Sequence, residues 1–152
     1  MKHAFINGQS GTGKSTLVRY FAEHPLAGWV FLDFDEGKYE SPKELGTERQ
    51  KEWKHKQHDW FLQEAVRIHR EQGMNVCVLG VSLFSWKAQG LASAHLIPKE
   101  DIHYGFLVAE PTVRRERLTQ RGDEHLLEED PARQQHFVEL AERNEREGAK
   151  RF

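Results

Sequence analysis

A glycine-rich stretch close to the start of the chain constrains the fold more than any other feature of the sequence. Residues 6–18 read INGQSGTGKSTLV, which contains the pattern G-x-x-x-x-G-K-[ST]. An apolar segment at residues 3–7 precedes the pattern, and apolar side chains at helical spacing follow it over residues 14–23. A strand, a glycine-rich turn and a helix in this order predict a phosphate-binding loop within an α/β fold.

The chemistry of phosphate binding explains the residue types of this loop. Glycines allow positive φ angles and let backbone N–H groups approach phosphate oxygens, and the following helix N-terminus adds a partial positive charge. We expect Lys14 to reach the β- and γ-phosphates of a nucleotide and the Ser15 hydroxyl to coordinate Mg²⁺. The predicted nucleotide-binding residues are Gly8, Gln9, Ser10, Gly11, Thr12, Gly13, Lys14, Ser15 and Thr16. The alternative interpretation is a glycine-rich turn that carries a surface lysine.

Further along the chain, strand-like segments alternate with helical ones. The strands are predicted at residues 29–34, 75–81 and 104–109, and the helices at 47–72, 111–121 and about 131–147. Strands that alternate with helices favour a parallel sheet with helices on both faces. We therefore predict a three-layer α/β fold in which residues 1–152 form one domain.

Composition and charge exclude several classes of function. The chain has 152 residues and a formal net charge of −2, which argues against a globally basic nucleic-acid-binding protein. Cys77 is the only cysteine, so an intrachain disulfide and a Cys-rich zinc site are excluded, and its apolar neighbours predict burial. The sequence has no leader-like apolar region at its start and no apolar run of the ~18 residues that span a bilayer. We expect a cytoplasmic protein without a membrane partner, and its oligomeric state stays open.

Two aspartates end the second predicted strand, in the segment FLDFDE. Asp33 and Asp35 are two residues apart, so on an extended strand both side chains point to the same face. They lie at the carboxyl edge, where parallel sheets bind their ligands. One aspartate could hold the metal and the other could accept the proton of an attacking hydroxyl, in either order. The alternative is that both simply end the strand and remain solvated.

The helix predicted at residues 111–121 carries three arginines. Arg114, Arg117 and Arg121 are spaced by three and four residues, so they share one helix face and could converge on phosphates. Acidic residues nearby could instead make this a salt-bridged, solvated helix. Arg121 is followed by Gly122, a candidate hinge, and is therefore the best candidate for a segment that closes over the site.

Together, these motifs resemble those of the small P-loop kinases of the shikimate kinase and gluconate kinase type, which are related to nucleoside monophosphate kinases. The resemblance rests on INGQSGTGKST, FLDFDE and the arginine-bearing helix, and it covers most of the chain. It implies a parallel sheet of order 2-3-1-4-5, ATP with Mg²⁺ at the loop, and a mobile lid. By this resemblance, Asp33 has a magnesium role, Asp35 a substrate or base role, and Arg117 and Arg121 are lid arginines.

The sequence departs from this family at two places. The third predicted strand leads into VLGVSLFSW, in which Gly80 matches only one residue of the glycine triplet usual in shikimate kinases. The acceptor is therefore left open. The chain ends in GAKRF, so we expect the fifth strand to be absent or truncated, which leaves the order 2-3-1-4. The resemblance places a substrate-binding segment at about residues 36–60 and a lid at about 114–130.

Aromatic, basic and histidine residues of the substrate-binding segment need separate interpretations. Its aromatic and lysine side chains could form a locally basic wall, but such tryptophans are more often core residues and such lysines solvated. The residues in question are Tyr39, Trp53, Lys54, Lys56 and Trp60. His55 and His58 have no third partner at metal-ligand spacing, so we predict that both are surface residues.

The sequence as a whole predicts an ATP- and Mg²⁺-dependent kinase that transfers the γ-phosphoryl group to a hydroxyl or phosphate of a small molecule. The predicted catalytic residues are Lys14, Asp35, Arg117 and Arg121, and the predicted metal ligands are Ser15 and Asp33. One alternative is a polynucleotide 5′-hydroxyl kinase, which the basic run RQKEWKHK at residues 49–56 suggests. A non-catalytic ATP-binding module is another. A GTP-dependent switch is disfavoured, because the sequence has no Asn-Lys-x-Asp segment to recognise guanine.

Overall fold

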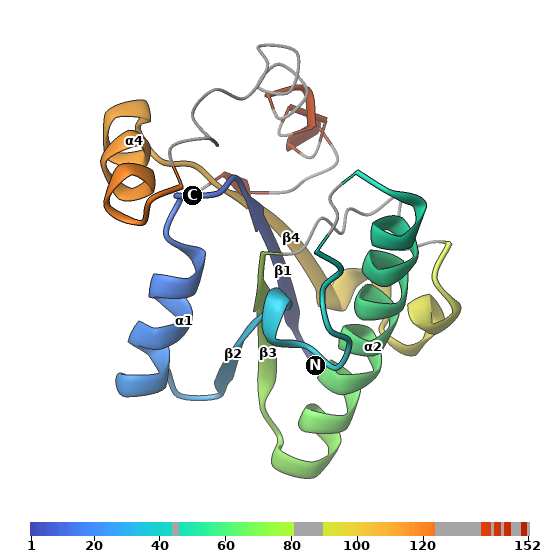
Figure 1. Cartoon of the computed structure of the whole chain (residues 1–152). Helices are drawn as coiled ribbons and strands as arrows, with labels where there is room; N and C mark the ends of the chain where they lie inside the picture. The colour runs from blue at the N-terminus through green and yellow to red at the C-terminus, as the bar shows by residue number, and fades with distance from the viewer. Residues whose placement is uncertain are drawn as a thin grey trace.

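The computed structural model of the protein is built around a parallel β-sheet (Figure 1). It describes residues 1–43, 46–80, 90–123, 138–140, 142, 143, 145, 146, 150 and 151. Within these residues the sheet has five strands in the order β2-β3-β1-β4-β5. The strands are β1 (His3–Gly8), β2 (Trp29–Asp33), β3 (Asn75–Leu79), β4 (Ile102–Leu107) and β5 (Lys150–Arg151). The predicted order of the first four strands is confirmed.

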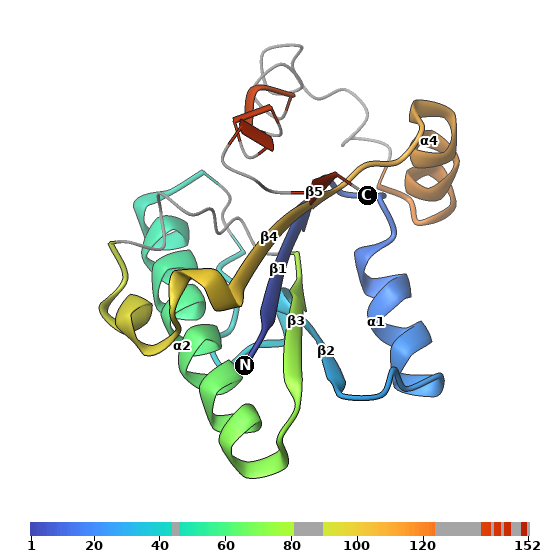
Figure 2. The same cartoon turned by 180° about the vertical axis from the view of Figure 1, so that it is seen from behind.

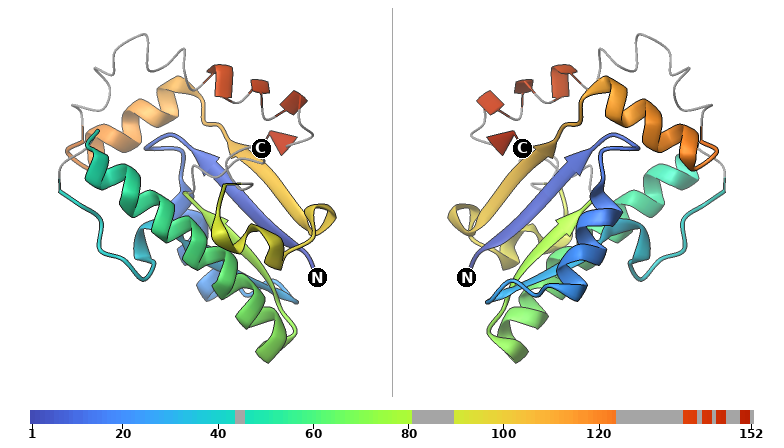
Figure 3. Two further views of the ribbon diagram at one scale, coloured as in Figure 1. Left: turned by 90° about the vertical axis from the view of Figure 1, so that its right-hand side faces the viewer. Right: turned by 90° about the vertical axis from the view of Figure 1, so that its left-hand side faces the viewer.

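Helices cover both faces of this sheet, as predicted. The longer described helices are α1 (Lys14–Glu23), α2 (Glu48–Gln72) and α4 (Pro111–Gln120). Figures 2 and 3 show α1 and α2 on opposite sides of the sheet, with α4 beyond the end of β4. Three short 3₁₀-helices complete these elements: η1 (Phe34–Glu36), η2 (Ala92–Leu96) and η3 (Lys99–Asp101). None of the described helices combines the length and the hydropathy that crossing a bilayer requires.

The core lies between the sheet and α2. Residues 76–79 of β3 are all buried, as expected for a strand between two neighbours in a sheet covered on both faces. The Thr47 hydroxyl accepts a hydrogen bond from the Gln50 N–H and so begins α2, and Gly73, with φ of 69°, ends it. The core side of α2 carries Trp53, Phe61, Leu62, Ala65 and Ile68. The hydrophobic spacing and the end signals therefore predicted this helix correctly.

The structure decides between the two alternatives for the fifth strand and corrects two other details of the prediction. The fifth strand is short rather than absent: β5 has two residues, in which Lys150 and Arg151 pair with Gly105 and Phe106 of β4. Strands pair through backbone hydrogen bonds, which do not require apolar side chains. A strand of two residues therefore has no recognisable pattern in the sequence. β4 also begins at Ile102, two residues earlier than predicted.

The second correction concerns His58, which is buried rather than on the surface, whereas His55 is exposed as predicted. The imidazole of His58 lies 4.7 Å from the Phe34 ring, centroid to centroid, on the core side of α2. In the helix predicted at about 131–147, residues 138–140, 142, 143, 145 and 146 are helical, and the others lie outside the described residues. Residues 124–130 of the predicted lid are also outside them.

Candidate active site

The loop between β1 and α1, which we call the glycine-rich loop (residues 8–15), has the backbone of an anion-binding turn. Gly11 and Gly13 have φ angles of 82° and 98°, in the left-handed region that favours glycine. A Cβ on Gly8 would lie 2.9 Å from both the Leu107 carbonyl oxygen and the Thr12 hydroxyl. Gly13 caps α1 with no side-chain hydrogen bond, so the first N–H groups of the helix remain suited to an anion.

Lys14 is folded back onto this loop. Its ammonium group donates hydrogen bonds to the carbonyl oxygens of Gly8 and Gln9, both at 2.7 Å. Burial lowers the pKa of Lys14 to about 8, and the positive charges of Arg121 and Arg114 act in the same direction. The carboxylates of Asp35 and Asp33 oppose this effect on the pKa. Lys14 therefore lies within the electrostatic field of both predicted aspartates.

The two aspartates come from different elements, although they face the same pocket. Asp33 is the last residue of β2, whereas Asp35 belongs to η1. The Asp33 Oδ1 atom accepts a hydrogen bond of 3.0 Å from the Asp35 N–H, which caps η1. Burial, and next the negative charge of Asp33, raise the pKa of Asp35 above its ordinary value. The prediction that both lie on one extended strand face was wrong in its reason, because the strand ends at Asp33.

The three arginines in and just after α4 differ in what they contact. Arg117 and Arg121 line the pocket. The Arg117 Nη1 atom donates a hydrogen bond of 3.3 Å to the Gly11 carbonyl oxygen, and Arg121 forms an ion pair of 2.9 Å with Asp123. Arg114 is buried, and its Nε atom donates a hydrogen bond of 2.8 Å to the Ser10 carbonyl oxygen. The three arginines therefore do not converge on the pocket, since Arg114 contacts the backbone of the loop instead.

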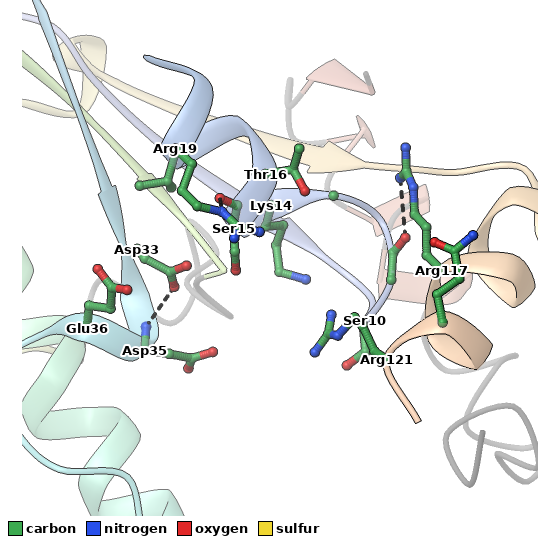
Figure 4. A pocket seen from close by; sticks show the side chains of 14 residues that line it. Ser10, Lys14, Ser15, Thr16, Arg19, Asp33, Asp35, Glu36, Arg117 and Arg121 are labelled. Carbon is green, nitrogen blue, oxygen red and sulfur yellow. Dashed lines mark hydrogen bonds between the residues drawn. The ribbon is translucent and has the colours of Figure 1, made fainter. Parts of the chain in front are cut away.

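One pocket of about 650 Å³ joins these groups. In Figure 4, Lys14 lies between the two aspartates on one side and Arg117 and Arg121 on the other. The lining residues are Ser10, Gly11, Gly13, Lys14, Ser15, Thr16, Val18, Arg19, Asp33, Asp35, Glu36, Arg117, Gln120 and Arg121. The predicted residues Gly8, Gln9 and Thr12 are not part of this lining. They contribute to the conformation of the loop, in which the Thr12 hydroxyl donates a hydrogen bond of 2.8 Å to the Gln9 carbonyl oxygen.

Comparison with known proteins was informative for structure only. No protein-family model and no curated protein matches the sequence. A shikimate kinase from Acinetobacter baumannii in complex with shikimate matches the structure with a TM-score of 0.55 and 16% identity, over 100% of this chain and 83% of that one. A gluconokinase from Sinorhizobium meliloti 1021 matches with a TM-score of 0.52 and 19% identity, over 86% and 76% of the two chains. The chain has the fold of the small P-loop kinases.

A third similar structure is a chain of the Pnkp1/Rnl/Hen1 RNA repair complex, with a TM-score of 0.53 and 17% identity. The match covers 81% of this chain but only 38% of the other. At these identities the likeness establishes the P-loop kinase fold, and the resemblance drawn from the sequence motifs is confirmed at that level.

Four residues that line the pocket of this P-loop kinase fold were not named individually by the prediction: Val18, Arg19, Glu36 and Gln120. Glu36 and Gln120 do lie within the predicted substrate-binding segment and lid. The sequence did contain an indication for Arg19, because this residue lies one helical turn after Ser15. In the structure its Nε atom donates a hydrogen bond of 3.3 Å to the Ser15 carbonyl oxygen. Gln120 likewise lies three residues after Arg117 on α4. The helical spacing of both residues from a predicted site residue would have identified them.

The substrate-binding segment does not form the aromatic wall that we considered. Trp53 is buried, and its Nε1–H donates a hydrogen bond of 2.8 Å to the Tyr39 carbonyl oxygen. Trp60 is half-buried and packs against the core. The ammonium group of Lys56 pairs with Glu52 at 2.7 Å. The tryptophans are therefore packing residues, which is the alternative that the sequence favoured.

The pocket also offers ligands that fit Mg²⁺. Ser15 and Asp33 contribute a hydroxyl and a carboxylate to the same lining, and oxygen ligands are what this hard cation prefers. In the described part of the chain, no group of three or more His, Cys, Asp or Glu residues could hold a metal ion. In phosphoryl-transfer sites Mg²⁺ is bound through one or two protein ligands together with phosphate oxygens and water, and this pocket has such a composition.

Proposed function

We propose that the protein is a kinase that transfers the γ-phosphoryl group of ATP to a hydroxyl of a small molecule, with Mg²⁺. One observation carries this proposal: a single pocket is lined by residues of the glycine-rich loop, including Lys14, and by Asp33, Asp35, Arg117 of α4 and Arg121 at the C-terminal end of α4. These are the groups that phosphoryl transfer needs, since its catalysis is mostly positioning and charge stabilisation. The P-loop kinase fold is consistent with this activity.

In this proposal the phosphates bind at the N-terminus of α1. The backbone N–H groups of the glycine-rich loop face them, and Lys14 exchanges carbonyl oxygens for phosphate oxygens as hydrogen-bond acceptors. Mg²⁺, held by Ser15 and Asp33, would neutralise charge on the β- and γ-phosphates. Arg117 and Arg121 stabilise the charge that spreads over the transferred group.

Asp35 is the residue that we assign to the acceptor. Its carboxylate lines the pocket opposite the arginines and can accept the proton of the attacking hydroxyl. The raised pKa of Asp35 makes it a stronger base than an ordinary aspartate. We therefore place the acceptor hydroxyl beside Asp35, and the segment at about residues 36–60 next to the rest of the acceptor.

A screen for ATP consumption tests the proposed activity directly. The acceptors should include nucleosides, nucleotides, sugar acids, aminoglycosides and oligonucleotide ends, and phosphate transfer to one of them is the expected result. Asp35→Asn should lower kcat by about 10²- to 10⁴-fold while the affinity for ATP changes little. Lys14→Ala should abolish transfer with an unchanged circular dichroism spectrum, whereas Lys51→Ala, which changes an exposed lysine of α2, should have no effect. Turnover retained by Lys14→Ala would contradict the assigned role of Lys14.

A polynucleotide 5′-hydroxyl kinase is the second candidate, because one similar structure is a chain of an RNA repair complex. The basic run at residues 49–56 supports it less than the sequence suggested. Lys51 pairs with Glu48 and Lys56 with Glu52, so much of the positive charge of the run is balanced within α2. Steeply salt-dependent binding of an oligonucleotide, together with phosphorylation of its 5′ end, would favour this second candidate.

A further inference from the structure

A glutamine of α2 lies directly beneath the turn that carries Asp35. Gln57 has no exposed surface, and both ends of its side-chain amide are bonded to this turn. Its Nε2 atom donates a hydrogen bond of 2.9 Å to the Phe34 carbonyl oxygen, and its Oε1 atom accepts one of 3.0 Å from the Tyr39 N–H. Burying an amide costs free energy unless the amide is hydrogen-bonded. The two hydrogen bonds therefore hold the Gln57 side chain in place, and they also hold the backbone of the turn against α2.

The turn also packs so closely against Gln57 that its central residue, Gly37, has no room for a side chain. A Cβ on Gly37 would lie 2.1 Å from the Nε2 atom of Gln57, 2.5 Å from its Cδ and 2.8 Å from its Oε1. Gly37 has a φ of −74°, which any residue adopts, so backbone strain does not explain the glycine. The glycine at position 37 is instead explained by the space that the Gln57 amide occupies.

Other residues of α2 support the same turn from its two sides. The Trp53 Nε1–H donates a hydrogen bond to the Tyr39 carbonyl oxygen, one helical turn before Gln57. The Phe34 ring is buried and packs against the rings of Trp53, His58 and Phe61. The backbone before and after Asp35 is thus attached to α2, while the Asp35 carboxylate faces the pocket.

We propose that Gln57 is a positioning residue for Asp35: it clamps the backbone from Phe34 to Tyr39 and so aims the Asp35 carboxylate at the acceptor. Gln57 does not line the pocket and acts through the turn alone. The inference rests on the proposed function, because it assigns Asp35 to the acceptor. It adds a second group, outside the pocket, on which the rate of transfer depends.

Gln57→Met separates positioning from packing. Methionine has a similar length and is apolar, so it fills the same space but makes neither hydrogen bond. We expect kcat to fall about 10- to 100-fold while KM for ATP stays within about twofold, because the ATP-binding loop is on other elements. Gly37→Ala should give the same result, since its Cβ displaces the amide. Gln63→Met is the matched control, because Gln63 is an exposed residue of the same helix and does not contact the turn.

A measurement on the unliganded protein makes the test independent of turnover. The Gln57 Oε1 atom accepts the Tyr39 N–H and its Nε2 atom donates to the Phe34 carbonyl oxygen, so loss of these bonds should speed hydrogen exchange of the Tyr39 amide and shift the backbone resonances of Asp35. NMR should show both changes in Gln57→Met and Gly37→Ala but not in Gln63→Met. Unchanged Tyr39 exchange and Asp35 resonances, or a lower Tm with unchanged kcat well below that Tm, would overturn the proposal. If the wild-type protein transfers phosphate to no acceptor, the proposed function fails, and these NMR measurements alone decide whether Gln57 holds the turn that carries Asp35.

Discussion

The ammonium group of Lys14 links nucleotide binding to pH. Its pKa is lowered to about 8 by burial, and a bound triphosphate would raise it again by adding negative charge. At pH values above about 8, binding must therefore take up a proton, and Kd for ATP should rise by up to about tenfold per pH unit. Isothermal titration calorimetry in buffers of different ionisation enthalpy measures this proton uptake directly.

Lys14→Arg is the control for that prediction. Arginine keeps its charge throughout this pH range, so the variant should bind ATP without proton uptake near pH 8.5, whatever its absolute affinity. The same uptake in Lys14→Arg as in the wild type would assign the proton to another group.

The pKa of Asp35 should depend on the carboxylates beside it. The negative charge of Asp33 is the second cause of the raised Asp35 pKa, after burial. In Asp33→Asn the amide oxygen can still accept the Asp35 N–H, so the turn is kept while the charge is lost. We expect ¹³C NMR to show a lower pKa of Asp35 in this variant than in the wild type. Glu36→Gln should lower it less, since the charge of Glu36 is the weakest of the named influences.

At the scale of elements, α4 and the glycine-rich loop form one packed unit. A Cβ on Gly11 would lie 3.0 Å from the Leu118 Cγ and 3.1 Å from the Arg114 Cγ, and Gly11 has a φ of 82°. We expect Gly11→Ala to push α4 away from the loop, to lower stability by about 1–3 kcal/mol and to weaken ATP binding at least about tenfold. Thermal unfolding and ATP titration measure the two effects.

Gly28→Ala is the control that separates the effect of packing against α4 from the effect of backbone strain. Gly28 has a φ of 78°, but a Cβ there would meet no atom within 4 Å. This variant should therefore show the backbone strain of Gly11→Ala without the loss of ATP affinity. Equal losses of affinity in both variants would show that the contact between α4 and the loop has no part in nucleotide binding.

Elements with strong local signals were predictable from the sequence. The cap at Thr47, the left-handed Gly73 and the apolar spacing between them define α2 locally. The glycine-rich loop was equally clear, because Gly11 and Gly13 have the positive φ angles that its pattern predicts. For β5 only the resemblance to the family indicated a strand, because two residues paired through the backbone carry no hydrophobic pattern of their own.

The misplaced residues depend on contacts that are distant in sequence. Arg114 looked like a phosphate ligand, but its Nε–H is taken by the Ser10 carbonyl oxygen, 104 residues away along the chain. His58 looked like a surface residue, but the Phe34 ring lies over it. Only the three-dimensional structure brings such partners together, so helix periodicity alone could not assign either residue.

At the scale of the whole molecule, a buried histidine makes the fold sensitive to acid. His3 has no exposed surface at the start of β1, and its Nδ1 atom accepts a hydrogen bond of 3.1 Å from the Val76 N–H. Burial first, and then the positive charges of His69 and the N-terminus, lower its pKa from 6.5 to about 4, whereas Asp101 acts in the opposite direction. The folded protein therefore keeps His3 neutral at pH values where the unfolded chain protonates it.

The sign of the resulting pH dependence follows from proton binding. Between about pH 6.5 and pH 4 the unfolded state binds a proton at His3 that the folded state does not, so the free energy of unfolding decreases as the pH falls. The pKa shift corresponds to a loss of up to ~3 kcal/mol in the free energy of unfolding across this pH range. Above pH 6.5, His3 does not contribute to the pH dependence of stability. Urea unfolding at pH 7, 5.5 and 4.5 measures this loss.

His3→Asn tests whether this one residue is responsible. The asparagine Oδ1 can replace Nδ1 as the acceptor for the Val76 N–H, but the side chain does not titrate. The free energy of unfolding of the variant should change much less between pH 7 and 4.5 than that of the wild type. The pH dependence that remains should come from its carboxylates. His55→Asn, at an exposed position of α2, should retain the full change. If His3→Asn is destabilised by acid as strongly as the wild type, then the acid sensitivity of the sheet originates in another buried group.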